Sequence, residues 1–307
     1  MTAIVLGLSA TYLLYLLNQK IVELNVHFII EQVLRYPIFL TVAILLMPIN
    51  WLIETVKWRL IICTFEKMPF LNAFKSVLLG VLLSVITPNR IGEIAGRLKH
   101  IQKENRVRGI HANVFSALSQ LTITILVGLL ALFYIDYPLI NDFNHLKWLW
   151  LFALFITLIA FLYSNKLHYI VSRLAKKFKQ DDALTTIPSL LRIKVLLLSL
   201  LRYIVFSFQF ILLSIMLGSK SEILQLAAAV AIVFLFTAIL PTNWASGLLV
   251  RTSLTFGVYE TLFNEGSIGL LASVLLWMIN LFLPAAIGLT IIPPMDWRKF
   301  KSLRSWK

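Results

Sequence analysis

The chain has 307 residues, of which 59% are hydrophobic and only 14% are charged. Because a soluble protein carries about 25% charged residues, this composition excludes an ordinary soluble domain and predicts an all-α polytopic membrane protein. The net charge of +14 lies mostly in loops between apolar stretches, which indicates positive-inside topology rather than nucleic-acid binding. The single Cys63 excludes an internal disulfide and any cysteine-based metal site.

The first half of the chain, residues 1–147, is predicted to contain two spans, a broken hairpin and a third span. No Lys or Arg precedes the first apolar run and no small-residue cleavage site ends it, so we interpret it as a span rather than a signal peptide. Residues 20–36 have apolar positions at helical spacing, which predicts an amphipathic interfacial helix. The predicted spans are residues 2–18, 37–53 and 110–135, and the hairpin is residues 69–97.

The second half, residues 148–292, follows the same plan. Residues 165–179 combine an apolar and a basic face, which indicates a helix on an anionic membrane surface. The predicted spans are residues 148–163, 195–217 and 268–292, the hairpin is residues 222–259, and a basic tail covers residues 293–307. We therefore expect one transmembrane domain, residues 1–307, with about six full spans and two hairpins.

The Lys and Arg residues of the loops predict their orientation. Twenty of them lie in residues 54–68, 97–108, 164–194 and 293–307, and four lie in residues 18–36, 136–147, 218–222 and 259–268. The positive-inside rule places the first set in the cytoplasm, together with both termini. Both flanks of the first hairpin are then cytoplasmic and both flanks of the second are external, so each hairpin is expected to be re-entrant.

Two opposed re-entrant hairpins in halves of matching plan predict an inverted-topology repeat, as in many secondary transporters. Short sequence echoes support the repeat. Ser84-Val-Ile-Thr-Pro88 resembles Thr237-Ala-Ile-Leu-Pro241, and an arginine follows the proline by nine positions in the first half and by ten in the second.

The stretch from Thr87 to Arg97 interrupts the first hairpin with polar residues. Thr87 or Asn89 can cap the helix that restarts after Pro88. The free N–H groups and the positive dipole end of that helix would form a natural anion site.

The charges of this stretch allow two interpretations. Arg90, Glu93 and Arg97 fall on roughly one helix face, where Glu93 can pair with either arginine. In one interpretation an arginine binds a phosphate, since its planar fork can bond two oxygens, while Glu93 orients that arginine or meets an amine. In the other, the charges form a self-neutralised cluster that only allows a broken helix to fold.

Other polar residues lie inside or beside apolar segments. Arg251 is expected to be a cavity ligand or a partner of Glu260 or of a headgroup, and Arg202 either reaches the inner interface or faces the cavity. Interhelical hydrogen bonds are the favoured role of the three amides that lie within spans, Gln120, Gln209 and Asn280. The second span is followed by the charged residues Glu54, Lys57 and Arg59. We expect them either to lie on a solvated helix end or to contact a lipid headgroup.

Enzyme motifs do not occur in the sequence. It has no Gly-rich phosphate loop, no Gly-x-Ser-x-Gly elbow and no His-Glu-x-x-His. The five histidines have no ligand spacing and are expected at interfaces or in loops. We therefore predict no enzyme activity, no cofactor and no metal.

Four stretches resemble the lysylphosphatidylglycerol synthase transmembrane-region family, also called the flippase-like domain family. The most specific is Thr87-Pro-Asn-Arg-Ile-Gly-Glu-Ile-Ala-Gly-Arg97, and the others are residues 50–58, 115–120 and 201–209. Membership would imply a role in moving lipids between leaflets. The soluble aminoacyl-transferase domain of full-length members is missing here, so no lipid lysylation is expected. The family's second motif, Gly-x-Arg-Glu, keeps its arginine at Arg251 but lacks the glutamate.

The resemblance and the topology together predict a lipid translocase of the cytoplasmic membrane for an anionic or zwitterionic phospholipid or aminolipid. The alternative is an accessory protein that presents a lipid or polyprenyl-linked substrate to a separate glycosyl- or aminoacyl-transferase. Membrane lipids are the expected partners, and in the alternative function the separate transferase would be a protein partner. The predicted headgroup-binding residues are Asn89, Arg90, Glu93, Arg97, Arg202, Asn243 and Arg251, with secondary roles for Thr87, Pro88, Gln120, Gln209, Pro241 and Asn280.

Overall fold

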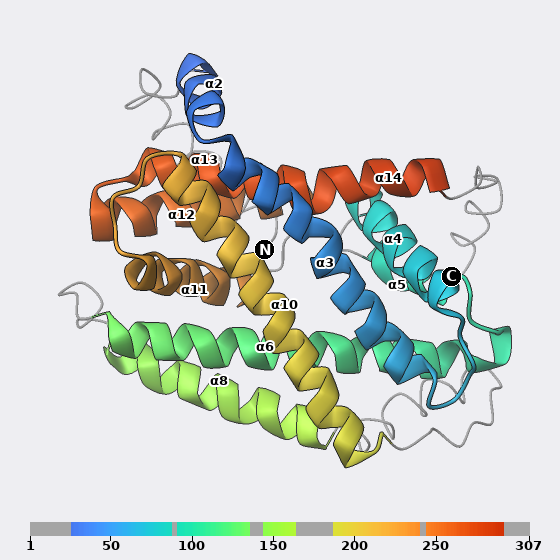
Figure 1. Cartoon of the computed structure of the whole chain (residues 1–307). Coiled ribbons are helices and arrows are strands. Elements are labelled where there is room, and N and C mark those ends of the chain that lie inside the picture. Colours follow the sequence, from blue (N-terminus) through green and yellow to red (C-terminus); the bar gives the residue numbers. More distant parts are fainter. Residues whose placement is uncertain (1–25, 88–90, 136–143, 164–186, 240–243, 292–307) are drawn as a thin grey trace.

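The computed structural model describes residues 26–87, 91–135, 144–163, 187–239 and 244–291, and these residues form helices and short connections without any strand. Figure 1 shows the arrangement. The helices are α2 (Val26–Arg35), α3 (Pro37–Ile62), α4 (Phe70–Ile86), α5 (Ile91–Leu98), α6 (Arg106–Tyr134), α8 (Asn144–Leu162), α10 (Ser189–Met216), α11 (Ile223–Ile239), α12 (Trp244–Phe263), α13 (Gly266–Trp277) and α14 (Leu283–Ile291), with a 3₁₀ turn, η3 (Lys103–Asn105), and a π-helical turn, η4 (Met278–Phe282).

Four helices of the described chain are long and apolar enough to cross a bilayer: Pro37–Ile62, Lys103–Tyr134, Ser189–Met216 and Gly266–Leu289. They coincide with four of the predicted spans. The predicted span 148–163 corresponds to α8, whose apolar part is shorter, and the span 2–18 lies outside the described residues. The protein is therefore an all-helical, multi-pass membrane protein.

The outer surface of α8 is apolar, as a lipid-facing surface should be. Trp148 is 75% exposed, and Phe152 and Phe155 are 60% and 59% exposed. Large exposed apolar surfaces are rare on soluble monomers, whereas acyl chains of a bilayer solvate such side chains. The exposure of α8 thus agrees with the composition of the chain.

Two long helices, α3 and α10, pack against each other in the middle of the molecule (Figure 1). Proline starts both of them, since Pro37 is the first residue of α3 and Pro188 precedes α10. The hairpin α4–α5 lies on one side of this pair and the helices α11 and α12 lie on the other, with the C-terminal ends of α4 and α11 directed toward the middle (Figure 1). In addition, α4 packs on α14, and α11 packs on α6.

Glycines allow α4 and α5 to pack backbone against backbone. A Cβ atom added at Gly96 would lie 2.4 Å from the backbone nitrogen of Gly80 and 2.6 Å from its Cα. Ser76, Gly80 and Ser84 lie at four-residue spacing, a sequence pattern that predicts a helix face for close packing, and Gly80 of this face is where α5 packs.

Replacing Gly96 with alanine is expected to destabilise the protein by about 1–3 kcal/mol, because the new methyl group meets backbone that cannot rotate away. The midpoint of thermal unfolding in detergent measures the effect. Gly109→Ala is the matched control, since its Cβ would meet the ends of the Leu98 and Ile101 side chains, which can move. An equal or smaller shift for Gly96→Ala would contradict the packing argument.

The last span contains one π-helical turn, residues 278–282, between α13 and α14. Pro284 explains it, because proline has no N–H and its ring clashes with the carbonyl four residues earlier, which is that of Asn280. The wider turn accommodates this proline and leaves Asn280 buried, at 5% exposure, on the inner side of the helix.

Candidate functional site

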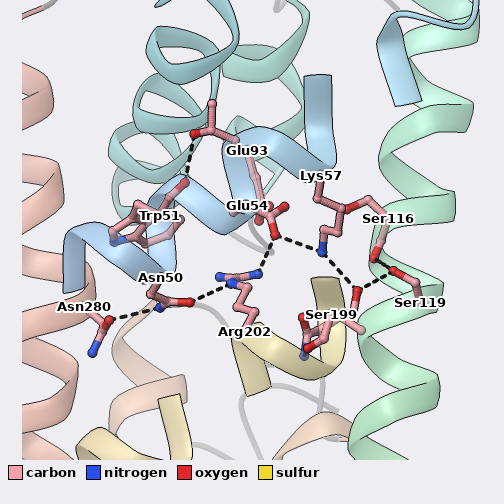
Figure 2. Close-up of polar contacts among 12 residues, drawn as sticks. Asn50, Trp51, Glu54, Lys57, Glu93, Ser116, Ser119, Ser199, Arg202 and Asn280 are labelled. Atoms are coloured by element: carbon pink, nitrogen blue, oxygen red, sulfur yellow. Dashed lines mark hydrogen bonds and ion pairs between the residues drawn. The ribbon is translucent and has the colours of Figure 1, made fainter. Parts of the chain in front are cut away.

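Glu54 is the centre of a buried ion cluster between α3, α5 and α10 (Figure 2). Its Oε1 accepts a hydrogen bond from Nη2 of Arg97 at 2.8 Å. Its Oε2 lies 2.9 Å from Nζ of Lys57 and 2.9 Å from Nη1 of Arg202. Arg97 also pairs with Glu93 at 2.8 Å, as the helical spacing predicts. One carboxylate therefore joins three cations from three helices.

Burial makes this arrangement energetically demanding. The side chains of Glu54 and Lys57 are 1% exposed, and that of Arg97 is 6% exposed. Charges removed from water are tolerated only where partners and hydrogen bonds compensate for the lost hydration. Loss of any partner would leave an uncompensated buried charge, so the cluster fixes α5 and α10 to α3.

The prediction of a solvated helix end for Glu54, Lys57 and Arg59 is wrong for the first two residues. The helix does not end there, because α3 continues to Ile62 with Glu54 and Lys57 turned inward. Arg59 donates from Nε to the backbone oxygen of Met68 at 3.0 Å. A sequence signal was available: Asn50, Glu54 and Lys57 are spaced i, i+4 and i+7, on one helix face.

A chain of hydroxyl groups extends the cluster toward α6 (Figure 2). Nζ of Lys57 donates to Oγ of Ser199 at 3.5 Å, and that Oγ lies 2.9 Å from Oγ of Ser119. Ser119 donates in turn to the backbone oxygen of Ser116 at 2.7 Å. The hydroxyl groups give the ammonium of Lys57 a polar environment, although its side chain is only 1% exposed.

A chain of amides extends the cluster in the other direction. Nε of Arg202 donates to Oδ1 of Asn50 at 3.1 Å, and Nδ2 of Asn50 donates to Oδ1 of Asn280 at 3.1 Å. Nδ2 of Asn280 donates to Oε1 of Gln209 at 3.1 Å, and Gln209 donates to the backbone oxygen of Ala43 at 2.7 Å. Gln209 and Asn280 thus make the interhelical bonds favoured from the sequence.

A cavity of about 450 Å³ lies beside these chains. Aromatic side chains line part of it, among them Trp51, Tyr203 and Trp277. Both broken hairpins contribute, through Ser84 of α4 and through residues of α11 and α12. Its polar lining includes Asn50, Gln120, Arg202, Thr237, Arg251 and Asn280. Such a mixture of apolar walls and a few convergent polar groups is typical of a ligand site.

The structure distributes the predicted site residues among three places. Arg202, Arg251, Gln120 and Asn280 line the cavity. Glu93 and Arg97 lie in the ion cluster, where they form one of the two pairings expected for Glu93, and the described lining of the cavity does not include them. Gln209 is fully buried. The remaining residues outside the described ranges are Pro88, Asn89, Arg90, Pro241 and Asn243.

Thr87 caps the restarted helix, as predicted. Its Oγ1 accepts a hydrogen bond from the backbone nitrogen of Gly92 at 2.8 Å and donates to the backbone oxygen of Leu83 at 2.7 Å. His111, expected at an interface or in a loop, is instead buried in α6 at 5% exposure. Among the described residues, no group of three His, Cys, Asp or Glu side chains could hold a metal ion.

The described residues form a helical, multi-pass fold with a partly polar cavity and a buried ion cluster, and these features define a polytopic membrane protein with polar groups in its interior. The chain belongs to the family described as lysylphosphatidylglycerol synthase TM region, whose sequence pattern matches residues 2–288. The protein is therefore a lipid-related membrane protein. A comparison with curated proteins found no match.

Proposed function

We propose that this protein is a lipid translocase, which moves a phospholipid headgroup between the leaflets of the cytoplasmic membrane. The observation that carries the proposal is the cavity, because α4 contributes to it from one side and α11 and α12 from the other. A headgroup could bind its polar lining while the acyl chains stay in the bilayer. The chain would act without cofactor or covalent chemistry.

Two pairs of helix contacts support the inverted repeat that this mechanism requires. In the proposed repeat α4 corresponds to α11, and α6 corresponds to α13–α14. The contact of α4 with α14 then has its counterpart in the contact of α11 with α6. The pair α3 and α10 lies at the centre, where a pseudo-twofold axis would relate one helix to the other (Figure 1). Residues 1–147 and 148–292 would be the two halves.

The same proposal predicts which surface each loop faces. In a variant whose exposed Cys63 is replaced with serine, Lys103→Cys should react with an impermeant thiol reagent only from the cytoplasmic side. Lys220→Cys should react only from outside. Both residues are exposed, so neither substitution disturbs a core. Labelling of Lys103→Cys from outside would contradict the re-entrant first hairpin, because residues 69–97 would then cross the membrane as an ordinary span.

A cavity-filling substitution tests the translocation itself. Ala238 lines the cavity and has an exposed side chain, so Ala238→Trp would occupy the cavity without displacing a core residue. We expect this variant to slow headgroup translocation at least about tenfold in reconstituted vesicles, since a blocked site removes the binding free energy of the headgroup.

Leu149→Trp is the matched control, because it adds the same side chain on the outer surface of α8, where Leu149 is 60% exposed. It should translocate lipid at the rate of the unmodified protein. Absence of translocation by the purified, folded chain would contradict the proposal and favour the accessory role with a separate transferase.

A further inference from the structure

Three hydroxyl groups of the cavity can accept hydrogen bonds from a ligand, because each already donates its own proton. They belong to Ser84, Thr124 and Thr237, which line the cavity. Each donates to a backbone oxygen of its own helix, at 2.7 Å for Ser84 and at 2.9 Å for both threonines. A hydroxyl oxygen that donates in this way keeps its two lone pairs. Toward a ligand, the three groups are therefore acceptors.

Two other side chains of the lining contain a buried polar atom that forms no hydrogen bond with any described residue. The atoms are Oε1 of Gln120, an acceptor, and Nε1 of Trp51, a donor. The amide nitrogen of Gln120 does have a partner, since it donates to the backbone oxygen of Ser199 at 3.4 Å. Buried polar atoms without a partner are rare and costly. A ligand that completed their hydrogen bonds would remove that cost.

The arginine beside these groups is fixed and already paired. Nε of Arg202 donates to Asn50 and its Nη1 donates to Glu54, while the ring of Trp51 lies 5.4 Å from its Cζ (Figure 2). The guanidinium is therefore preoriented in the cavity wall, and its charge is balanced there by Glu54. A ligand at this place is recognised by the hydrogen bonds that it can exchange with the lining.

Hydroxyl groups match the lining better than an ammonium or a phosphate does. A hydroxyl both donates and accepts, so it can donate to Thr237 or to Oε1 of Gln120 and accept from Nε1 of Trp51. An ammonium only donates, and a phosphodiester only accepts. Several acceptors call for several hydroxyl groups, and the aromatic side chains of Phe206 and Trp277 offer apolar surface for the C–H groups that carry them.

We propose that the cavity binds a lipid headgroup with several hydroxyl groups on a ring, that is, a sugar or a cyclitol. This inference rests on the proposed function and names its substrate class. The ring hydroxyls donate to the oxygens of Ser84, Thr124, Gln120 and Thr237 and accept from Trp51. A site that hydrogen-bonds hydroxyl groups discriminates strongly against an analogue that lacks them, because its polar atoms then stay unpaired.

The transport test compares three phospholipids in phosphatidylcholine vesicles that contain the purified protein. Phosphatidylinositol carries a hydroxylated ring, phosphatidylmethanol has the same phosphodiester and charge without any hydroxyl group, and phosphatidylethanolamine offers an ammonium instead. We expect phosphatidylinositol to cross at least about tenfold faster than either of the others. Equal rates for phosphatidylinositol and phosphatidylmethanol would overturn the hydroxyl selectivity and leave translocation intact. An equal rate for phosphatidylethanolamine would assign the acceptors to an ammonium. Transport of none of the three would overturn the proposed function.

A threonine variant ties the selectivity to the cavity. Thr237→Val keeps the shape of the side chain and removes one acceptor, so the ratio between phosphatidylinositol and phosphatidylmethanol should narrow by about threefold or more. Thr157→Val is the matched control, because Thr157 donates to backbone oxygens three and four residues earlier, as Thr237 does, but lies on α8 outside the described lining. Equal ratios for the two variants would remove Thr237 from the site.

A binding measurement separates a lipid headgroup from a soluble polyol. In a detergent without sugar groups, phosphatidylinositol should raise the midpoint of thermal unfolding more than phosphatidylmethanol does, and free inositol at the same concentration should raise it far less. Equal stabilisation by free inositol would overturn the lipid assignment, since the site would then bind a soluble polyol. No difference between the two lipids would overturn the recognition of hydroxyl groups.

Discussion

Glu54→Gln is expected to destabilise the purified protein by about 3–5 kcal/mol, the usual effect of breaking a buried ion pair. The substitution keeps the shape of the side chain but leaves three cations close together with only Glu93 as a carboxylate partner. Thermal unfolding in detergent, followed by helical circular dichroism, measures the loss. Glu104→Gln is the matched control, because Glu104 is an exposed loop residue.

A double variant sharpens this test. Glu54→Gln combined with Arg97→Gln removes one carboxylate and one of its cations. The double variant should therefore lose less free energy of unfolding than the two single variants lose in sum. Strict additivity would mean that Glu54 and Arg97 do not interact through charge. A shift for Glu54→Gln no larger than that of Glu104→Gln would show that the cluster does not hold the helices together.

Arg202→Gln is expected to slow lipid translocation at least about tenfold while costing less stability than Glu54→Gln. The difference follows from the contacts: without Arg202, Glu54 still pairs with Lys57 and Arg97, but the cavity loses its preoriented guanidinium. An anion bound by such a group gains about 1.5–3 kcal/mol from each charged hydrogen bond. Translocation in vesicles and unfolding in detergent should be measured on the same preparation.

Two companion variants complete the design. Lys194→Gln removes an exposed charge from α10, the helix that contains Arg202. It should change neither the translocation rate nor the free energy of unfolding. Arg202→Lys keeps the charge but loses the planar fork, so we expect an intermediate rate. Full activity of Arg202→Gln with normal stability would remove Arg202 from the site.

Much of the fold could be predicted because its signals are local. Pro37 starts α3, and small residues at four-residue spacing mark the face of α4 that contacts α5. The predicted spans 110–135, 195–217 and 268–292 differ from α6, α10 and the α13–α14 helix by only a few residues at each end. Apolar length and helix breakers are sufficient for such predictions.

The site was less predictable, because its central contacts join distant residues. Glu54 meets Arg97 across 43 positions and Arg202 across 148. In the sequence, the charged residues after Ile53 have the same pattern as the solvated end of a span, and only the fold shows that α3 continues inward. By contrast, the pair Glu93–Arg97 lies within one helix, where spacing alone predicts it.

The contact between Gly80 and Gly96 limits how the protein can move. The backbone of Gly96 packs directly on the backbone of Gly80, and the side chains of Glu93 and Arg97 pack beside this contact, so the two helices are closely packed here. We therefore expect the hairpin α4–α5 to rock as one rigid body, with hinges in the connections 63–69 and 99–105. In that motion the ion pair between Arg97 of α5 and Glu54 of α3 would have to break before the hairpin could move away from α3.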